Sequence, residues 1–172
     1  MGIPIPPDEP ERLENLLSLE VLDTRINYQL ETITQIASRT FGAPIALVSL
    51  VDSERQWFKA KWGLDVSETP REQAFCAHAI MDRETMVVKD ATEDERFSSN
   101  PLVTGDPSIR FYAGAPLVTQ SGYSIGGCAS STTNPDSRPS TNSQPCNSLR
   151  HWRSASCRTR PNTPSCKPRR NQ

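Results

Sequence analysis

Apolar residues recur at intervals of three and four positions in two segments near the N-terminus. These segments, residues 11–22 and 26–41, are predicted to form amphipathic helices, each with one face against a core. Gly42 follows the second segment and is typical of a helix C-terminus. Residues 1–10 contain four prolines and no apolar period, so we predict an extended lead-in there.

Shorter apolar runs farther along the chain predict strands. We expect strands over 45–51, 56–62, 86–89 and 109–119, a short helix over 73–81, a loop with one helical turn over 90–100, and the beginning of another strand at 124–126. The first run is nearly all apolar, which favours a central strand, and the turn after it favours an antiparallel hairpin with the second run. The order of elements indicates an α+β fold in which helices flank an antiparallel sheet.

The apolar pattern ends after residue 126, where the composition also changes. Residues 127–172 contain 14 Ser or Thr and 6 Pro, and their large apolar residues are Leu149 and Trp152. A segment of this composition cannot bury enough surface to offset its conformational entropy, so we predict that 127–172 is disordered. The folded domain is therefore expected at residues 11–126.

Charged residues are unevenly divided between these two parts. The chain has 19 basic and 20 acidic residues, of which 8 basic and 1 acidic fall within 127–172, so the tail is basic and the rest acidic. Such a tail is typical of nucleic-acid binding, although another explanation is given below. Four of the five cysteines also lie in the tail, and their spacing predicts neither a zinc site nor a disulfide scaffold.

Five segments of the predicted domain form a recognisable series. They read Ile-Ala-Leu-Val-Ser-Leu-Val-Asp at 45–52, Arg-Gln-Trp-Phe-Lys at 55–59, Glu-Thr-Pro-Arg at 68–71, Phe-Cys-Ala-His-Ala-Ile at 75–80 and Ile-Arg-Phe-Tyr-Ala-Gly-Ala-Pro-Leu at 109–117. Over residues 7–126 this series resembles the bacterial GAF domains that precede histidine kinases and diguanylate cyclases. The resemblance implies a GAF-like, PAS-related fold and a sensory role in two-component-like signal transduction.

The sequence departs from that family at residues 127 and 128. The family continues with a strand containing Cys-Val-Ile-Asp and a long closing helix, and a displaced reading frame across residues 128–137 can spell that strand. We therefore hypothesise that the tail is out-of-frame translation, which makes its basic charge incidental, and we predict no nucleic-acid partner. The domain is then incomplete at its C-terminus, and because the absent strand would lie beside residues 45–51, we expect low stability and aggregation.

Eight residues are candidates for ligand binding, because the resemblance implies that a small molecule binds between the sheet and the helices. They are Trp57, Phe58, Phe75, Cys76, His78, Phe97, Arg110 and Tyr112. The alternative, that the aromatic members are plain core, stays open. Arg55, Arg71 and Arg110 could bind an anionic ligand through paired hydrogen bonds, or could form ion pairs with the acidic residues.

Cys76 and His78 are the one Cys and His pair close together in the predicted domain, which raises the alternative of a thiol-dependent enzyme. Side chains two positions apart on a helix point in different directions, so these two do not converge on one proton or ion. Some GAF proteins attach a bilin through a cysteine or reduce methionine sulfoxide with several cysteines, whereas this domain has one cysteine, in Cys-Ala-His. We predict no catalytic residue, metal or cofactor.

The resemblance implies a cytoplasmic regulatory module that binds a small molecule or a partner and controls an output domain. No apolar stretch approaches the ~20 residues of a membrane helix, so we expect no membrane partner. The two N-terminal helices resemble the element through which such modules pair, and a homodimer is one expected assembly. Two alternatives remain: a redox or chromophore-linked protein that uses Cys76, and a truncated fragment without activity.

Overall fold

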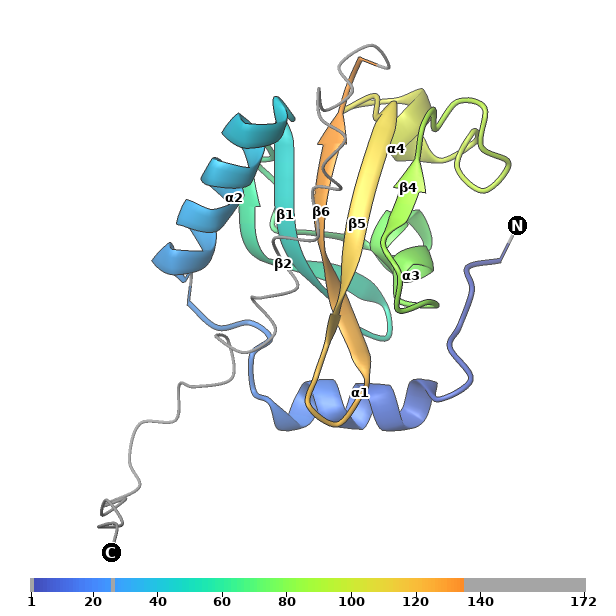
Figure 1. The fold of residues 1–172 in the computed structure, drawn as a ribbon. Helices are drawn as coiled ribbons and strands as arrows, with labels where there is room; N and C mark the ends of the chain where they lie inside the picture. The colour runs from blue at the N-terminus through green and yellow to red at the C-terminus, as the bar shows by residue number, and fades with distance from the viewer. Residues whose placement is uncertain (1, 26, 135–172) are drawn as a thin grey trace, which may run out of the picture.

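A six-stranded antiparallel sheet forms the centre of the fold, with the strand order β3-β2-β1-β6-β5-β4 (Figure 1). The strands are β1 (Ile45–Val51), β2 (Arg55–Trp62), β3 (Glu68–Pro70), β4 (Met86–Val88), β5 (Phe111–Val118) and β6 (Ser124–Thr132). The computed structural model describes residues 2–25 and 27–134. The predicted α+β fold, an antiparallel sheet flanked by helices, is confirmed.

Helices cover both faces of the sheet. They are α1 (Glu9–Ser18), α2 (Tyr28–Phe41), α3 (Phe75–Ala79) and α4 (Pro101–Thr104), with a 3₁₀ turn at Arg71–Gln73 before α3. Leu16 of α1 packs with Leu50 of β1, and Leu30 of α2 packs with Val48, so both helices contact the same face of that strand. Val51 packs with α3 on the opposite face. Figure 1 shows α1 running across the lower end of the sheet.

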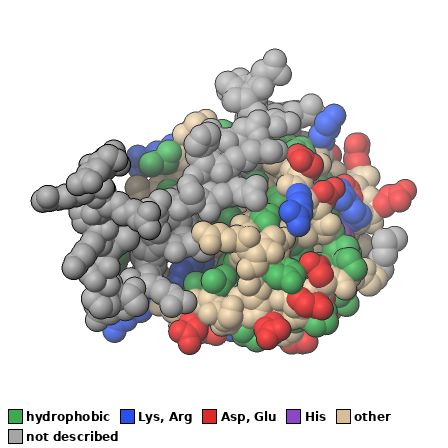
Figure 2. All heavy atoms as spheres, turned by 60° about the horizontal axis from the view of Figure 1, so that its bottom comes forward, with side chains coloured by type: hydrophobic (Ala, Val, Ile, Leu, Met, Phe, Trp, Pro, Cys, Tyr) green, Lys and Arg blue, Asp and Glu red, His purple; other side chains and the backbone are tan. Residues whose placement is uncertain are grey.

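The surface at the α1 end is mixed in character. Figure 2 turns this end toward the viewer and shows acidic and basic side chains interspersed with apolar ones. Across the described ranges, we find no helix with both the length and the apolar character that spanning a bilayer demands.

The end of α2 follows the prediction, and its start lies two residues later. The side-chain oxygen of Asn27 accepts hydrogen bonds from the backbone amides of Gln29 and Leu30, which satisfies two donors at the start of the helix. At the other end Gly42 has φ 61°, and its amide donates to the carbonyl of Ser38. This left-handed cap is the role expected of Gly42 from the sequence.

The helix α1 differs from the prediction at both ends. It begins at Glu9, inside the predicted lead-in, because Pro10 is tolerated in a first helical turn where its missing amide hydrogen is not needed. It ends at Ser18 instead of residue 22, and Glu20 has a left-handed φ of 50° that a right-handed helix cannot contain. The leucines beyond Ser18 still pack in the core, so their apolar spacing extended the predicted helix too far.

Three short elements were missed or misplaced. The strand β3 lies between the elements predicted at 56–62 and 73–81, where no strand was predicted, and it pairs with β2 through Gln56 opposite Thr69. The helix α4 follows the predicted loop, with Asn100 accepting a hydrogen bond from the amide of Leu102. The predicted helix 73–81 is reduced to α3. Elements this short do not fill the window of about 4–8 residues for a strand, or about 11–18 for a helix, over which a periodic apolar pattern is recognised.

The prediction that the last strand is missing after residue 126 is wrong. β6 continues to Thr132 and pairs with β1 on one side and with β5 on the other. Cys128 packs with Leu30 on the α2 face, and Ala129 joins the core on the α3 face. Hydrogen bonds of a sheet are made by the backbone, so a strand of small residues can occupy the middle of a sheet between bulkier neighbours. Residues 127–132 contain no bulky apolar side chain, so no apolar pattern in the sequence predicts this part of β6.

This strand removes the reason for the expected instability, since β1 is paired along both edges. The disorder predicted for 127–172 is wrong for residues 127–132, which are strand. Two further predictions for the tail are its out-of-frame origin and the absence of a closing helix. For residues 135–172 both lie outside the described residues.

Candidate functional site

Five of the eight candidate residues come together on the α3 face of the sheet. The rings of Phe75 and Phe97 stack with centroids 4.0 Å apart and planes 9° apart. Tyr112 of β5 lies 5.0 Å from Phe75, and His78 of α3 meets Phe97 edge-on at 4.8 Å. Together with Cys76 these four residues form a group that we call the aromatic cluster. Its rings pack on one another as core.

Cys76 is the one thiol of this cluster, and the residue is 1% exposed. Ser49 Oγ donates to its sulfur at 3.2 Å, and Tyr112 Oη lies 3.2 Å from the sulfur on another side. Burial raises the pKa of Cys76, and the hydrogen bonds from Ser49 and Tyr112 oppose that rise without cancelling it. At neutral pH the group is therefore a thiol and not the thiolate that a nucleophile needs.

His78 is half-buried and carries little positive charge at neutral pH. Burial lowers its pKa, the nearby Arg96 lowers it further, and Asp94 opposes both effects. No hydrogen bond joins His78 to Cys76 in the part of the chain that the structure describes. This agrees with the opposed directions predicted from their spacing of two on a helix.

The other three candidates lie apart from the aromatic cluster. Trp57 is on the opposite face of the sheet, against Leu16, so it cannot line a cavity together with the aromatic cluster. Phe58 packs in a separate group with Ile45 and Leu47. Arg110 donates to the backbone carbonyls of residues 103 and 109, at 2.9 and 3.1 Å, and so fastens the start of β5 to α4.

An open cavity of about 460 Å³ lies at the connection between α1 and α2. It is lined by Thr24, Arg25, Asn27, Tyr28, Gln29 and Lys59. None of these residues was a candidate in the sequence analysis. The alternating pattern that places Lys59 on β2 was visible in the sequence. Nothing in the sequence, however, indicates that residues 24–29 lie beside Lys59.

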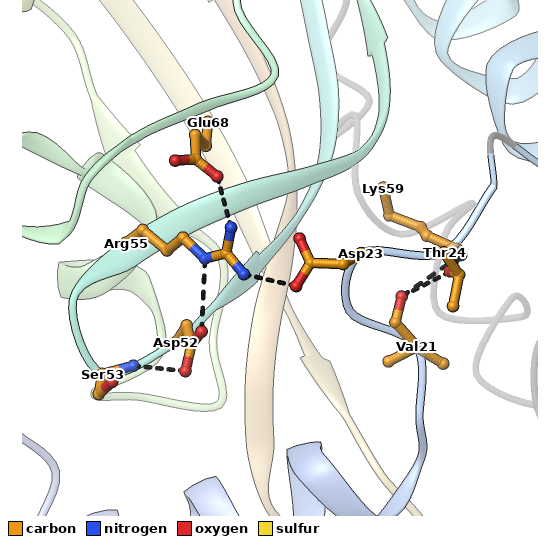
Figure 3. Close-up of polar contacts among 8 residues, drawn as sticks. All are labelled: Val21, Asp23, Thr24, Asp52, Ser53, Arg55, Lys59 and Glu68. Atoms are coloured by element: carbon orange, nitrogen blue, oxygen red, sulfur yellow. Dashed lines mark hydrogen bonds and ion pairs between the residues drawn. The ribbon is translucent and has the colours of Figure 1, made fainter.

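A polar network fixes this connection to β2 (Figure 3). The Arg55 guanidinium binds Glu68 at 2.6 Å and Asp23 at 2.7 Å, and lies 3.5 Å from Asp52. The hydrogen bonds that Arg55 donates to Asp23 and Glu68 raise the pKa of Arg55. Lys59 donates to the carbonyl of Val21 at 3.4 Å and also contacts Thr24. Arg55 is thus engaged with carboxylates of the chain itself, which favours the ion-pair interpretation over an anion-binding one.

A second polar group lies at the end of β1 and is almost completely buried. Arg12 holds Glu9 through two parallel hydrogen bonds of 2.7 and 2.8 Å, and its third nitrogen donates to the carbonyl of Val51 at 2.8 Å. Arg71 donates from Nη1 to Glu9 at 2.5 Å and to the carbonyl of Asp52 at 3.0 Å. We call Arg12, Glu9 and Arg71 the buried triad. It carries two positive charges and one negative charge.

The electrostatics of Glu9 reflect this surplus of positive charge. Burial alone would raise the pKa of its carboxyl, but the hydrogen bonds from Arg12 and Arg71 outweigh burial and the pKa is lowered. Glu9 is therefore ionised at neutral pH. Neither Glu9 nor Arg12 was identified from the sequence, which predicted Glu9 in the extended lead-in and Arg12 at the start of a helix.

Metal binding finds no support in the described residues, where no group of three or more His, Cys, Asp or Glu side chains could hold an ion. The described residues therefore offer three features: a packed aromatic cluster, a wide-open surface hollow, and a buried triad.

Comparison with known proteins connects this chain to one family. The family model described as GAF domain matches residues 28–131. A cyclic di-GMP phosphodiesterase of Pseudomonas aeruginosa is 46% identical over 123 residues, which cover 72% of this chain and 21% of that protein. The chain thus spans about a fifth of the length of this relative.

Solved structures share the fold at low sequence identity. The GAF domain of a phosphoenolpyruvate-protein phosphotransferase from Coxiella burnetii has a TM-score of 0.58 and 14% identity, covering 84% of this chain and 89% of that one. A type II free methionine-R-sulfoxide reductase from Thermoplasma acidophilum has a TM-score of 0.57 and 13% identity, covering 74% and 86%. Likeness at this level shows the fold alone.

Proposed function

This chain belongs to the GAF domain family, and from that premise we propose that it is a sensory domain that regulates an attached or associated signalling output. The observation that supports the proposal most is the 46% identity to one segment of a cyclic di-GMP phosphodiesterase. Because the matching segment is only 21% of that protein, the similarity concerns one module of a longer chain. We propose an output that makes or degrades cyclic di-GMP, with a histidine kinase as the second possibility.

The arrangement of the described residues supports binding over catalysis. A sensor must hold a ligand or partner and shift between conformations, which requires shape and charge but no activated nucleophile. The chain offers buried arginines and a wide-open surface hollow between residues 24–29 and Lys59 for this purpose. The Cys76 thiol, in contrast, is enclosed and protonated.

A thiol-dependent oxidoreductase is the second candidate, because one structural neighbour reduces methionine sulfoxide. Repeated reduction of a sulfoxide by cysteine chemistry needs a second thiol to release the oxidised first one as a disulfide. Among the described residues the two cysteines are Cys76 and Cys128, both buried. They lie on opposite faces of β6, since Cys76 contacts Ser49 whereas Cys128 packs with Val48. The sheet separates them, which favours the sensory proposal.

The two candidates differ in what happens when Cys76 is replaced by alanine. We expect the full chain to show no reduction of free methionine sulfoxide with dithiothreitol, and Cys76→Ala to give the same background rate. The matched control is Cys128→Ala, which removes the other buried thiol. Turnover in the unaltered chain that disappears in Cys76→Ala alone would replace the sensory proposal with the enzymatic one.

A further inference from the structure

Lys59 is placed by an irregularity in the sheet. Val48 of β1 lies opposite Ala60 of β2, and Ser49 lies opposite Phe58, so Lys59 is an extra residue with no partner across this strand pair. Such a β-bulge bends the strand and redirects a side chain. The side chain of Lys59 reaches the connection between α1 and α2, where it lines the surface hollow.

The side-chain nitrogen of Lys59 meets two acceptors in this connection (Figure 3). It donates to the carbonyl of Val21 at 3.4 Å and to Oγ1 of Thr24. Thr24 donates its own hydroxyl hydrogen to the same carbonyl at 2.8 Å, so toward Lys59 it acts as an acceptor. Of the three hydrogen-bonding positions on the nitrogen, two are therefore used, and the third has no hydrogen-bond partner within the described chain.

These contacts suit an uncharged amine. Burial lowers the pKa of Lys59 below the ordinary lysine value of 10.5. The ring of Trp57 attracts a positive charge, but at 5.5 Å from the nitrogen it is near the far limit of such contacts. A neutral amine keeps two hydrogens, which match the two acceptors, and its lone pair then takes the third position. An amine with an available lone pair is a nucleophile toward carbonyl groups.

The surface hollow gives a small reagent access to this nitrogen. It opens to solvent and has a volume of about 460 Å³. Arg25 also lines it, and no carboxylate of the described residues forms an ion pair with Arg25. The charge of Arg25 favours a reagent that carries negative charge. Acyl phosphates combine an activated carbonyl group with an anionic leaving group, and so match both features.

We propose that Lys59 is an acylation site of this domain and that its acyl donor is a small acyl phosphate. The nitrogen attacks the acyl carbon and forms a C–N bond. The C–O bond to phosphate breaks, phosphate leaves with the bonding electron pair, and the nitrogen releases one proton to solvent. No oxidant or reductant takes part, and the reaction does not depend on a sensory function of the domain.

Acylation would loosen the connection between α1 and α2. The product is an uncharged amide with a single N–H, whereas the amine of Lys59 serves two acceptors. Either Val21 or Thr24 therefore loses its hydrogen bond to β2. The positive charge that Lys59 places beside this connection is lost as well.

The first test measures where acetyl phosphate acetylates the full chain at about pH 8, with mass spectrometry of the peptides that contain Lys59 and Lys89. Lys89 is an exposed lysine just after β4 and serves as the internal reference. We expect acetylation of Lys59 to be at least about fivefold faster in the folded chain, and the two rates to agree within about twofold in concentrated urea. A Lys59 rate no higher than that of Lys89 in the folded chain would overturn the proposal, and so would an advantage that persists in urea.

The second test measures the effect on the connection through tryptic cleavage after Arg25. Lys59→Gln imitates the uncharged product and should raise the rate of this cleavage at least about threefold. The matched control is Lys61→Gln, because the amine of Lys61 on the same strand binds the carbonyls of residues 65 and 66 instead. It should be cleaved after Arg25 at the rate of the unaltered chain. Equal rates in Lys59→Gln and Lys61→Gln would contradict the proposed loosening.

Discussion

Replacement of Glu9 by glutamine lowers the free energy of unfolding by about 3 kcal/mol, the cost typical of removing one partner from a buried ion pair. Among the described residues, Glu9 is the one carboxylate in contact with both Arg12 and Arg71, and these arginines are 1% and 4% exposed. Without its charge, two guanidinium groups remain buried side by side. Urea denaturation of the purified chain measures the effect.

The matched control is Glu11→Gln, which removes the same charge from an exposed position of the same helix. It should change stability by less than about 0.5 kcal/mol. Equal stability of the two variants would show that the buried triad does not hold α1 on the sheet.

The pH dependence of stability provides a second test of the Glu9 ion pairs. Because the folded-state pKa of Glu9 is lowered from the ordinary value of 4.5, its contribution to stability is fully present above pH 4.5 and is lost as the pH falls through the folded-state pKa. The difference in stability between the unaltered chain and Glu9→Gln should therefore shrink below pH 4.5. A difference that is constant between pH 3 and pH 7, or roughly so, would contradict the assigned ionisation.

Replacement of Gly126 by alanine should be equally damaging, with a loss of about 3 kcal/mol or failure to fold. A Cβ atom at this position would lie 2.0 Å from the carbonyl oxygen of Ser49 and 2.9 Å from the Cα of Leu50. Both are backbone atoms of β1, and β6 cannot move away because β5 holds its other edge. The two central strands would have to separate.

Gly127→Ala provides the comparison within the same strand. Its Cβ would meet the Cys76 sulfur at 3.3 Å and a backbone oxygen at 3.4 Å, which a shift of a few tenths of an ångström relieves. We expect a loss of about 1 kcal/mol. Thermal melting of both variants checks the register, and a Gly126→Ala protein as stable as the unaltered chain would mean that β6 does not pair with β1 as described.

The long elements of the fold could be predicted because their apolar residues repeat over several turns or strand positions. α2 and β1 are clear examples, with a capping glycine after the helix and an apolar run in the strand that only Ser49 interrupts. β6 could not be predicted beyond residue 126, because its Gly, Ala and Ser residues contribute backbone pairing without a bulky pattern. The short β3 and α4 depend on contacts with distant segments.

The candidate site was predicted in part, and the reason differs between residues. Phe75, Cys76 and His78 were found through a sequence motif, and the structure does bring them near Phe97. Trp57 and Phe58 pack on opposite faces of the sheet, because successive side chains alternate along a strand. This signal was present in the sequence but was not applied to the candidate site. The contact of Glu9 with Arg71 spans 62 positions, and nothing local predicts it.

The most direct test of the proposed regulatory role is the phosphodiesterase activity of the Pseudomonas aeruginosa relative with its matching segment deleted, or replaced by this chain. The account predicts that deletion changes the activity at least about fivefold, and that the chimera containing this chain restores the original rate to within about twofold. Activity that is the same with the segment, without it and with this chain in its place would contradict a regulatory function for the domain.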